Sequence, residues 1–159
     1  MTAELSVPAL AVESLVVHFP ARHGPPVRAV DGVSFSVAER ETLGLVGESG
    51  CGKSTIANAV VGLVRPTRGE VRVAGTPIAG ATTHTLRAIR AKAQMVFQDP
   101  ATSLNPRMTV GAAIGEPLLV RGLARGRALE ARVAALLSEV GLRPEHASRY
   151  PHQFSGGQR

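Results

Sequence analysis

A glycine-rich run between a short apolar segment and a helical pattern constrains this chain more than any other feature. Residues 47–54 read GESGCGKS: a glycine, four residues, a second glycine, lysine and serine. Thr42 to Val46, just before it, has the almost wholly apolar pattern of a central strand. Ser54 to Leu63, just after it, has the spacing of a helix. A strand, a glycine loop and a helix in this order predict a loop that wraps a phosphate chain.

The predicted phosphate-binding loop spans residues 47–55. Its glycines let backbone N–H groups point at anionic oxygens, and the helix that follows adds the positive end of its dipole. Lys53 is expected to reach the terminal phosphates as a catalytic group, Ser54 to ligate Mg²⁺, and Thr55 to add a second hydroxyl contact. The side chains of Glu48 and Cys51 are assigned no chemistry of their own. The loop residues expected to contact the ligand are Gly47, Glu48, Ser49, Gly50, Cys51, Gly52, Lys53, Ser54 and Thr55.

Composition sets the broad class. With 159 residues, 44% of them hydrophobic, the chain is long enough to bury one sizeable core. Its net charge of +6 comes from arginines scattered along the sequence rather than from a run, which is typical of a solvated surface, so no nucleic-acid partner is expected. No secretory signal and no membrane-spanning segment is expected, and one cysteine permits no internal disulfide.

Hydrophobic periodicity predicts an α/β fold with a β-rich part over about residues 1–99 and a helical part over about residues 100–159. The expected strands are Ala11–Phe19, Val33–Val37, Thr42–Val46, Glu70–Val73, Thr76–Ile78 and Gln94–Gln98. The expected helices are Ser54–Leu63, Thr85–Ala91, Thr109–Val120 and Arg127–Val140.

A phosphate loop alone leaves kinases, GTPases and helicases open, and a second motif narrows the choice. Residues 150–159, YPHQFSGGQR, resemble the signature of ATP-binding-cassette ATPases, normally Leu-Ser-Gly-Gly-Gln, with Phe154 as the departure. Ser155 is expected to cap a helix, while Gly156 and Gly157 leave backbone N–H groups bare for a phosphate. The resemblance implies a P-loop NTPase fold of this type, ATP and Mg²⁺ as ligands, and a contact from Ser155 to Gln158 with the nucleotide of a partner subunit.

Two further positions resemble functional residues of the same family. Gln98 matches the glutamine loop, whose amide meets the metal and the attacking water and signals to the membrane partner. Phe19 matches the aromatic residue that stacks on adenine, although a core phenylalanine is an equally good interpretation.

The run from Val96 to Val110, VFQDPATSLNPRMTV, looks like the oligopeptide and dipeptide importer ATPases, a group that includes nickel and glutathione importers. This resemblance implies a peripheral subunit on the cytoplasmic face of the inner membrane. Its implied partners are a second ATP-binding subunit, two integral membrane permease subunits and, indirectly, an external solute-binding protein. ATP hydrolysis would then drive uptake of peptides or a related small solute.

Hydrolysis in this family needs an Asp and a Glu at the end of a strand beyond the signature, and a later switch histidine. Asp31 and Asp99 are the only aspartates and neither follows four apolar residues, so we expect a cassette domain truncated before that strand. Such a chain would bind nucleotide without turnover and expose sheet edges that favour aggregation. A cassette ATPase of DNA repair or translation remains the alternative, and it predicts salt-sensitive nucleic-acid binding.

Overall fold

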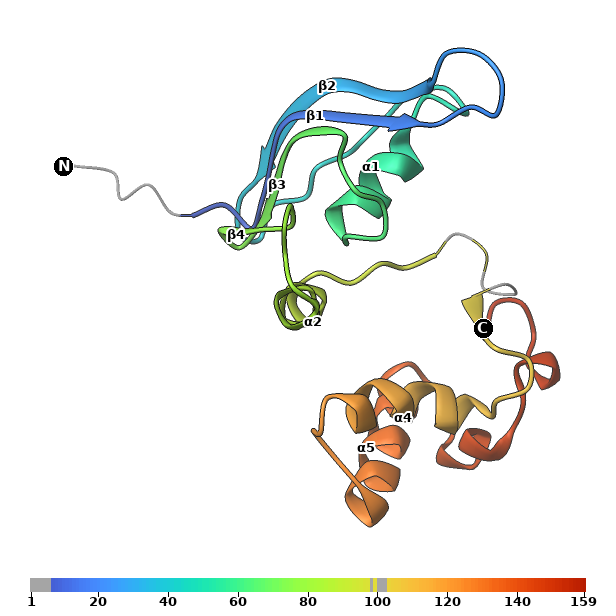
Figure 1. The fold of residues 1–159 in the computed structure, drawn as a ribbon. Coiled ribbons are helices and arrows are strands. Elements are labelled where there is room, and N and C mark those ends of the chain that lie inside the picture. The colour runs from blue at the N-terminus through green and yellow to red at the C-terminus, as the bar shows by residue number, and fades with distance from the viewer. Residues whose placement is uncertain (1–6, 98, 100–102) are drawn as a thin grey trace. The chain divides into compact units, whose positions relative to one another are not determined.

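The computed structural model describes residues 7–97, 99 and 103–159, and it combines strands with helices as expected for an α/β chain (Figure 1). The internal contacts divide the chain into two compact units, Met1–Met95 and Val96–Arg159. The first unit contains the strands, and the second unit is helical in the part that the structure describes.

An antiparallel sheet with the strand order β2-β1-β3-β4 forms the first unit. Alternating side chains along the central strand β1 explain its place, because Val12, Leu15 and Val17 are buried while their neighbours are less so. All four strands match expected ones, with β2 starting earlier than the pattern predicted. Their bounds are Leu10–Phe19 for β1, Val27–Val37 for β2, Arg68–Val73 for β3 and Thr76–Pro77 for β4.

Two helices complete the core of this unit. In α1 (Lys53–Val60), Ile56 and Ala59 are buried, and in α2 (Thr83–Lys92) Ile89 is buried in the same apolar cluster as the sheet. The side chain of Arg90 donates hydrogen bonds to the carbonyl oxygens of Val61 and Gly62, at 3.3 and 3.0 Å. Because the last carbonyls of a helix lack internal partners, Arg90 fixes the end of α1 to α2.

The expected strand at Thr42–Val46 is wrong for this structure. The segment has no regular secondary structure, and its apolar side chains face solvent, with Val46 93% exposed. Residues 94–97 of the expected strand Gln94–Gln98 are likewise irregular, with Val96 and Phe97 exposed, while Gln98 lies outside the described residues. An apolar run becomes a strand only when a neighbouring strand supplies hydrogen bonds, and among the described residues neither segment pairs with one.

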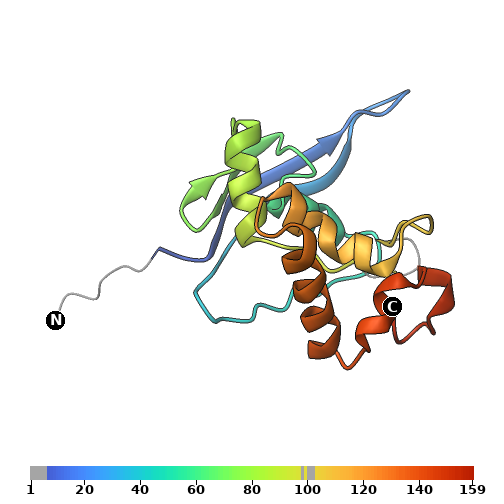
Figure 2. The same cartoon turned by 90° about the horizontal axis from the view of Figure 1, so that it is seen from below.

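The second unit contains α4 (Val110–Val120), α5 (Gly126–Glu139) and the short 3₁₀ turns η1 (Pro144–Ser148) and η2 (Pro151–Gln153), as Figure 2 shows. Thr109 caps α4, because its hydroxyl accepts a hydrogen bond from the Ala112 N–H. Val133 and Leu137 of α5 are buried on one helical face. Both helices confirm the expected pattern to within one residue at each end. Within the described ranges, no helix has the length and apolar character needed to cross a bilayer.

Candidate nucleotide-binding site

The last glycine of the loop leads directly into α1, as the sequence predicted, although the segment before the loop is not a strand. Gly50 and Gly52 have backbone φ angles of +82° and +97°, a region that residues with a Cβ rarely adopt. The Ile56 N–H bonds to the Gly52 carbonyl at 3.0 Å, so the first helical turn closes on the loop itself. The unpaired backbone N–H groups at the start of α1 therefore lie directly at the end of the glycine loop, where they can bind an anion.

Strand β2 explains why Gly52 must be a glycine. A Cβ built on Gly52 would lie 2.1 Å from the carbonyl oxygen of Ala29 and 3.5 Å from a methyl group of Val30. No side chain fits in that space without moving the backbone of β2 or the loop. The start of α1 is thus seated against the sheet, and the sheet sets the position of the loop.

Lys53 closes the loop from the inside. Its Nζ donates hydrogen bonds to the carbonyl oxygens of Gly47 and Glu48, at 2.7 and 2.6 Å, and lies 3.5 Å from Cys51 Sγ. The ammonium group therefore points back across the loop rather than into solvent. The loop therefore holds a full positive charge at its centre, which suits an anionic ligand such as a phosphate chain.

The remaining loop side chains fall into two groups. Ser54 is exposed at the first turn of α1, and its hydroxyl makes no hydrogen bond to a described residue, so it is accessible as a metal ligand. Thr55 is half-buried. Glu48 and Cys51 are exposed, and the sulfur of Cys51 occupies the space that a Cβ on Gly47 would need, at 2.6 Å. The donor set fits a phosphate chain with Mg²⁺, since its cation, N–H groups and hydroxyl gather at one helix start.

Phe19 lies at the end of β1, where it is 41% exposed and therefore not a core residue. It pairs with Val27 across the β1–β2 ladder. Ala29, whose carbonyl contacts Gly52, is only two residues further along β2, a rise of roughly 7 Å. Strand β2 thus connects the exposed ring of Phe19 to the phosphate loop.

The signature segment, residues 150–159, is exposed except at Pro151 and Phe154, which are buried. Phe154 is only 6% exposed and meets the ring of His146 edge to face, with centroids 5.5 Å apart. Gly156 and Gly157 are exposed, and a Cβ on either would meet no atom within 4 Å. Because the apolar Phe154 is packed, the glycines after it stay free to approach another molecule closely.

The role of Ser155 as a helix cap stays a prediction, since Ser155 precedes a single turn. Residues 155–159 form a single turn, closed by the Arg159 N–H on the Ser155 carbonyl at 3.2 Å, and no helix is assigned there. The Gln158 side chain instead accepts a hydrogen bond from the Ser155 N–H, at 3.1 Å. A side-chain amide that reaches back three residues satisfies the same kind of donor that a capping serine would have satisfied.

Gln98, expected at the metal and the attacking water, lies outside the described residues. In the part of the chain that the structure describes, no group of three or more His, Cys, Asp or Glu side chains could hold a metal ion. The sequence interpretation also missed Ala29 and Arg90, which fix the two ends of α1. The contact of Ala29 is made by its main-chain carbonyl, which no sequence pattern can indicate. Arg90 was one of many scattered arginines, and nothing in the sequence distinguished it from the others.

Comparison with known proteins then decides the family. A family model described as ABC transporter matches residues 30–159. The chain belongs to the ABC transporter family. Glutathione import ATP-binding protein GsiA of Pectobacterium atrosepticum is 51% identical over 96% of this chain and 25% of its own length. Oligopeptide transport ATP-binding protein OppF of Escherichia coli is 48% identical over 94% of this chain and 47% of its own length.

A solved member of this ABC transporter family resembles the chain in fold. The ATP-binding cassette MJ0796, in a dimeric post-hydrolysis state bound to ADP and Pi, superposes with a TM-score of 0.81 at 28% identity. The superposition covers 94% of this chain and 64% of that one. The chain spans a quarter to less than half of the length of these two curated relatives. The expected α/β fold class and the ABC transporter family are confirmed.

Proposed function

We propose that this chain is the ATP-binding part of an ABC importer subunit. In a dimerised, full-length cassette it binds MgATP and hydrolyses it to drive uptake of peptides or a related small solute. The observation that carries this proposal is the geometry of residues 47–55, where Lys53 bridges two loop carbonyls and Gly52 is held against β2. The similarity to GsiA and OppF supports the importer group and the solute class.

Each predicted residue has a role in this proposal. The loop N–H groups and Lys53 hold the phosphates, Ser54 and Gln98 ligate Mg²⁺, and Phe19 stacks on adenine. The exposed turn of residues 155–158 contacts nucleotide held by a second ATP-binding subunit, which the dimeric state of the similar cassette MJ0796 supports. Residues up to about 99 form the nucleotide-binding core, and the residues after them form a helical subdomain.

The proposed setting follows from the same relatives. Two integral membrane permease subunits are the partners, an external solute-binding protein acts indirectly, and the subunit lies on the cytoplasmic face of the inner membrane. In this proposal the contact with the membrane is made through the permease subunits.

The first test is nucleotide binding by the chain itself, measured by isothermal titration calorimetry. We expect MgATP to bind at one site per chain. Removal of Mg²⁺ with EDTA should weaken the binding, since the metal ion that joins Ser54 to the phosphates is then lost. A DNA duplex and an RNA hairpin serve as competitors. Tight, salt-sensitive nucleic-acid binding in addition to ATP binding would contradict the importer proposal and favour a cassette ATPase of DNA repair or translation.

Substitution of Phe19 by alanine separates recognition of adenine from recognition of phosphate. We expect the affinity for ATP to fall by about three- to tenfold, because an aromatic stacking contact contributes roughly 0.5–1.5 kcal/mol. Binding of inorganic tripolyphosphate, which has no ring, should not change. The matched control is Val27→Ala, since Val27 is the exposed partner of Phe19 on β2. Equal losses for ATP and tripolyphosphate would show that Phe19 acts through the fold and not on the base.

A further inference from the structure

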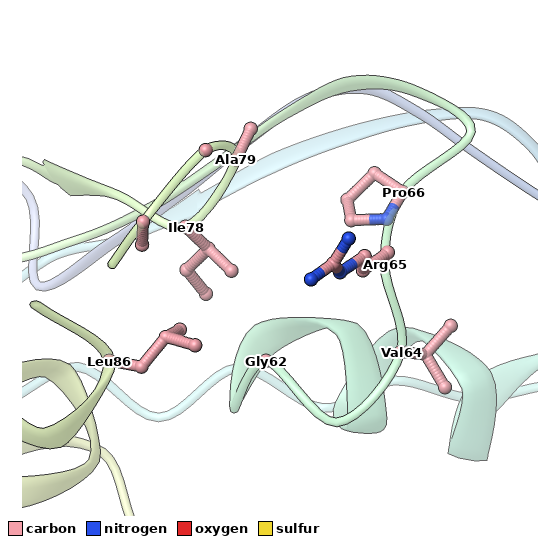
Figure 3. A pocket seen from close by; sticks show the side chains of 9 residues that line it. Gly62, Val64, Arg65, Pro66, Ile78, Ala79 and Leu86 are labelled. Atoms are coloured by element: carbon pink, nitrogen blue, oxygen red, sulfur yellow. The ribbon is translucent and has the colours of Figure 1, made fainter. Parts of the chain in front are cut away.

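A pocket of about 310 Å³ lies in the first unit, away from the glycine loop. Its walls come from three segments: the turn after α1, the turn after β4 and the first part of α2. Figure 3 shows that Ile78 and Leu86 line one side, and that the Arg65 side chain extends from the other side into the space between Ile78 and Pro66. The pocket therefore combines apolar side chains with a single charged group, Arg65.

The guanidinium of Arg65 is the part of this pocket that lacks a partner. Among the residues that the structure describes, it forms no ion pair and no hydrogen bond, whereas Arg72 is paired with Glu70 and Arg90 with two carbonyls. Arg65 is also the only charged residue lining the pocket. A guanidinium beside apolar walls presents a planar set of donors that matches a carboxylate.

The charge of the surrounding sequence also favours a negatively charged ligand. Between Ser49 and Phe97 the chain has seven Lys and Arg residues, and its one acidic residue, Glu70, is already paired with Arg72. The helix α2 carries Arg87, Arg90 and Lys92 and no acidic side chain. A surface with so uneven a charge attracts acidic partners and repels basic ones.

The walls of the pocket are fixed in place, so it is preformed. Gly62 has a φ of +69°, and a Cβ there would lie 3.1 Å from Leu86 and 3.5 Å from Ile78. The hydrogen bonds from Arg90 to Val61 and Gly62 tie this turn to α2. A site whose shape already exists requires little ordering when it is filled.

We propose that this pocket is a docking site for an acidic peptide segment of a protein partner. One Asp or Glu carboxylate of that segment pairs with Arg65, and a neighbouring apolar side chain packs against Ile78 and Leu86. A peptide is favoured over a phosphate ligand because Arg65 is the single cation in the lining and apolar side chains such as Ile78 and Leu86 lie beside it. The proposal does not depend on nucleotide binding, since none of the residues 47–55 lines this pocket.

The test uses the ¹⁵N-labelled chain and two synthetic peptides, acetyl-Ala-Leu-Glu-Leu-Ala-amide and the same peptide with Gln in place of Glu. We expect the Glu peptide to shift the amide NMR signals of Gly62, Gly80 and Ala81 and to bind at least about fivefold more tightly than the Gln peptide. Arg65→Ala should weaken binding of the Glu peptide by about tenfold, since one charge-assisted pair is lost.

The matched control is Arg87→Ala, which removes an equal charge from an exposed position of α2 that does not line the pocket. It should change the affinity by less than twofold. Three outcomes would overturn the proposal: equal binding of the two peptides, equal losses in the two variants, or tighter binding of inorganic phosphate than of the Glu peptide. The last outcome would assign the pocket to a phosphate-bearing ligand. ATP titrated into Arg65→Ala should bind as in the unaltered chain, which separates this site from the glycine loop.

Discussion

Replacement of Lys53 by alanine is expected to reduce the affinity for MgATP by about 100-fold, the largest effect of any single side chain. The ammonium group supplies the only full positive charge within residues 47–55. Loss of a charge-assisted contact costs roughly 1.5–3 kcal/mol, and a tenfold change in affinity corresponds to about 1.4 kcal/mol. Isothermal titration calorimetry of the variant with MgATP measures the effect. Its bonds to the Gly47 and Glu48 carbonyls are lost as well, so the empty loop should also become less ordered.

The sequence offers a matched control for this experiment, since Lys92 is the only other lysine. It is exposed at the end of α2, outside the loop. Lys92→Ala removes the same charge from the chain and should leave the affinity for MgATP within about twofold. If both variants bound MgATP equally weakly, the net charge rather than the position of Lys53 would be responsible, and the assignment of the loop would be wrong.

Replacement of Gly52 by alanine should both destabilise the fold and abolish the shape of the loop. A Cβ 2.1 Å from the Ala29 carbonyl forces β2 or the loop to move, and the φ of +97° adds strain for any residue with a Cβ. Strain of this backbone conformation costs roughly 1–2 kcal/mol, and forced repacking about 1–3 kcal/mol. We therefore expect the free energy of unfolding to fall by about 2–5 kcal/mol and the affinity for MgATP to fall more than tenfold.

Gly24→Ala separates the two costs in this prediction. Gly24 has a nearly identical φ of +95°, but a Cβ there would meet no atom within 4 Å. This control should lose only the backbone part, about 1–2 kcal/mol, and should bind MgATP normally. Urea unfolding followed by circular dichroism measures both variants. Equal losses of stability in Gly52→Ala and Gly24→Ala would show that the contact with Ala29 has no energetic role.

The sequence predicted correctly those structural features that depend on interactions between residues close together in the chain. The alternation in β1 and the glycine–lysine loop before α1 each follow from neighbouring residues, and the structure places them within one or two residues of the prediction. The strand expected at Thr42–Val46 failed for the opposite reason. Its pattern reports how apolar the segment is, whereas strand formation depends on a partner strand elsewhere in space.

The Arg65 pocket was also beyond the reach of sequence reasoning. Its walls join residues from three segments between Gly62 and Leu86, and the packing of α2 against the end of α1 brings them together. Phe19 was predicted only in part. Its ring could be assigned to a core or to a ligand from the sequence, and the exposure of its side chain excludes the core.

The short helix α1 joins the nucleotide-binding loop to the pocket that contains Arg65. Lys53 stands at its first residue, and the turn at its end, which Arg90 holds, forms one wall of the pocket. Eight residues of helix span only about 12 Å and behave as a stiff rod. If a peptide in the pocket moves this rod, thermodynamic reciprocity requires that nucleotide change the affinity for the peptide by the same factor as the peptide changes the affinity for nucleotide.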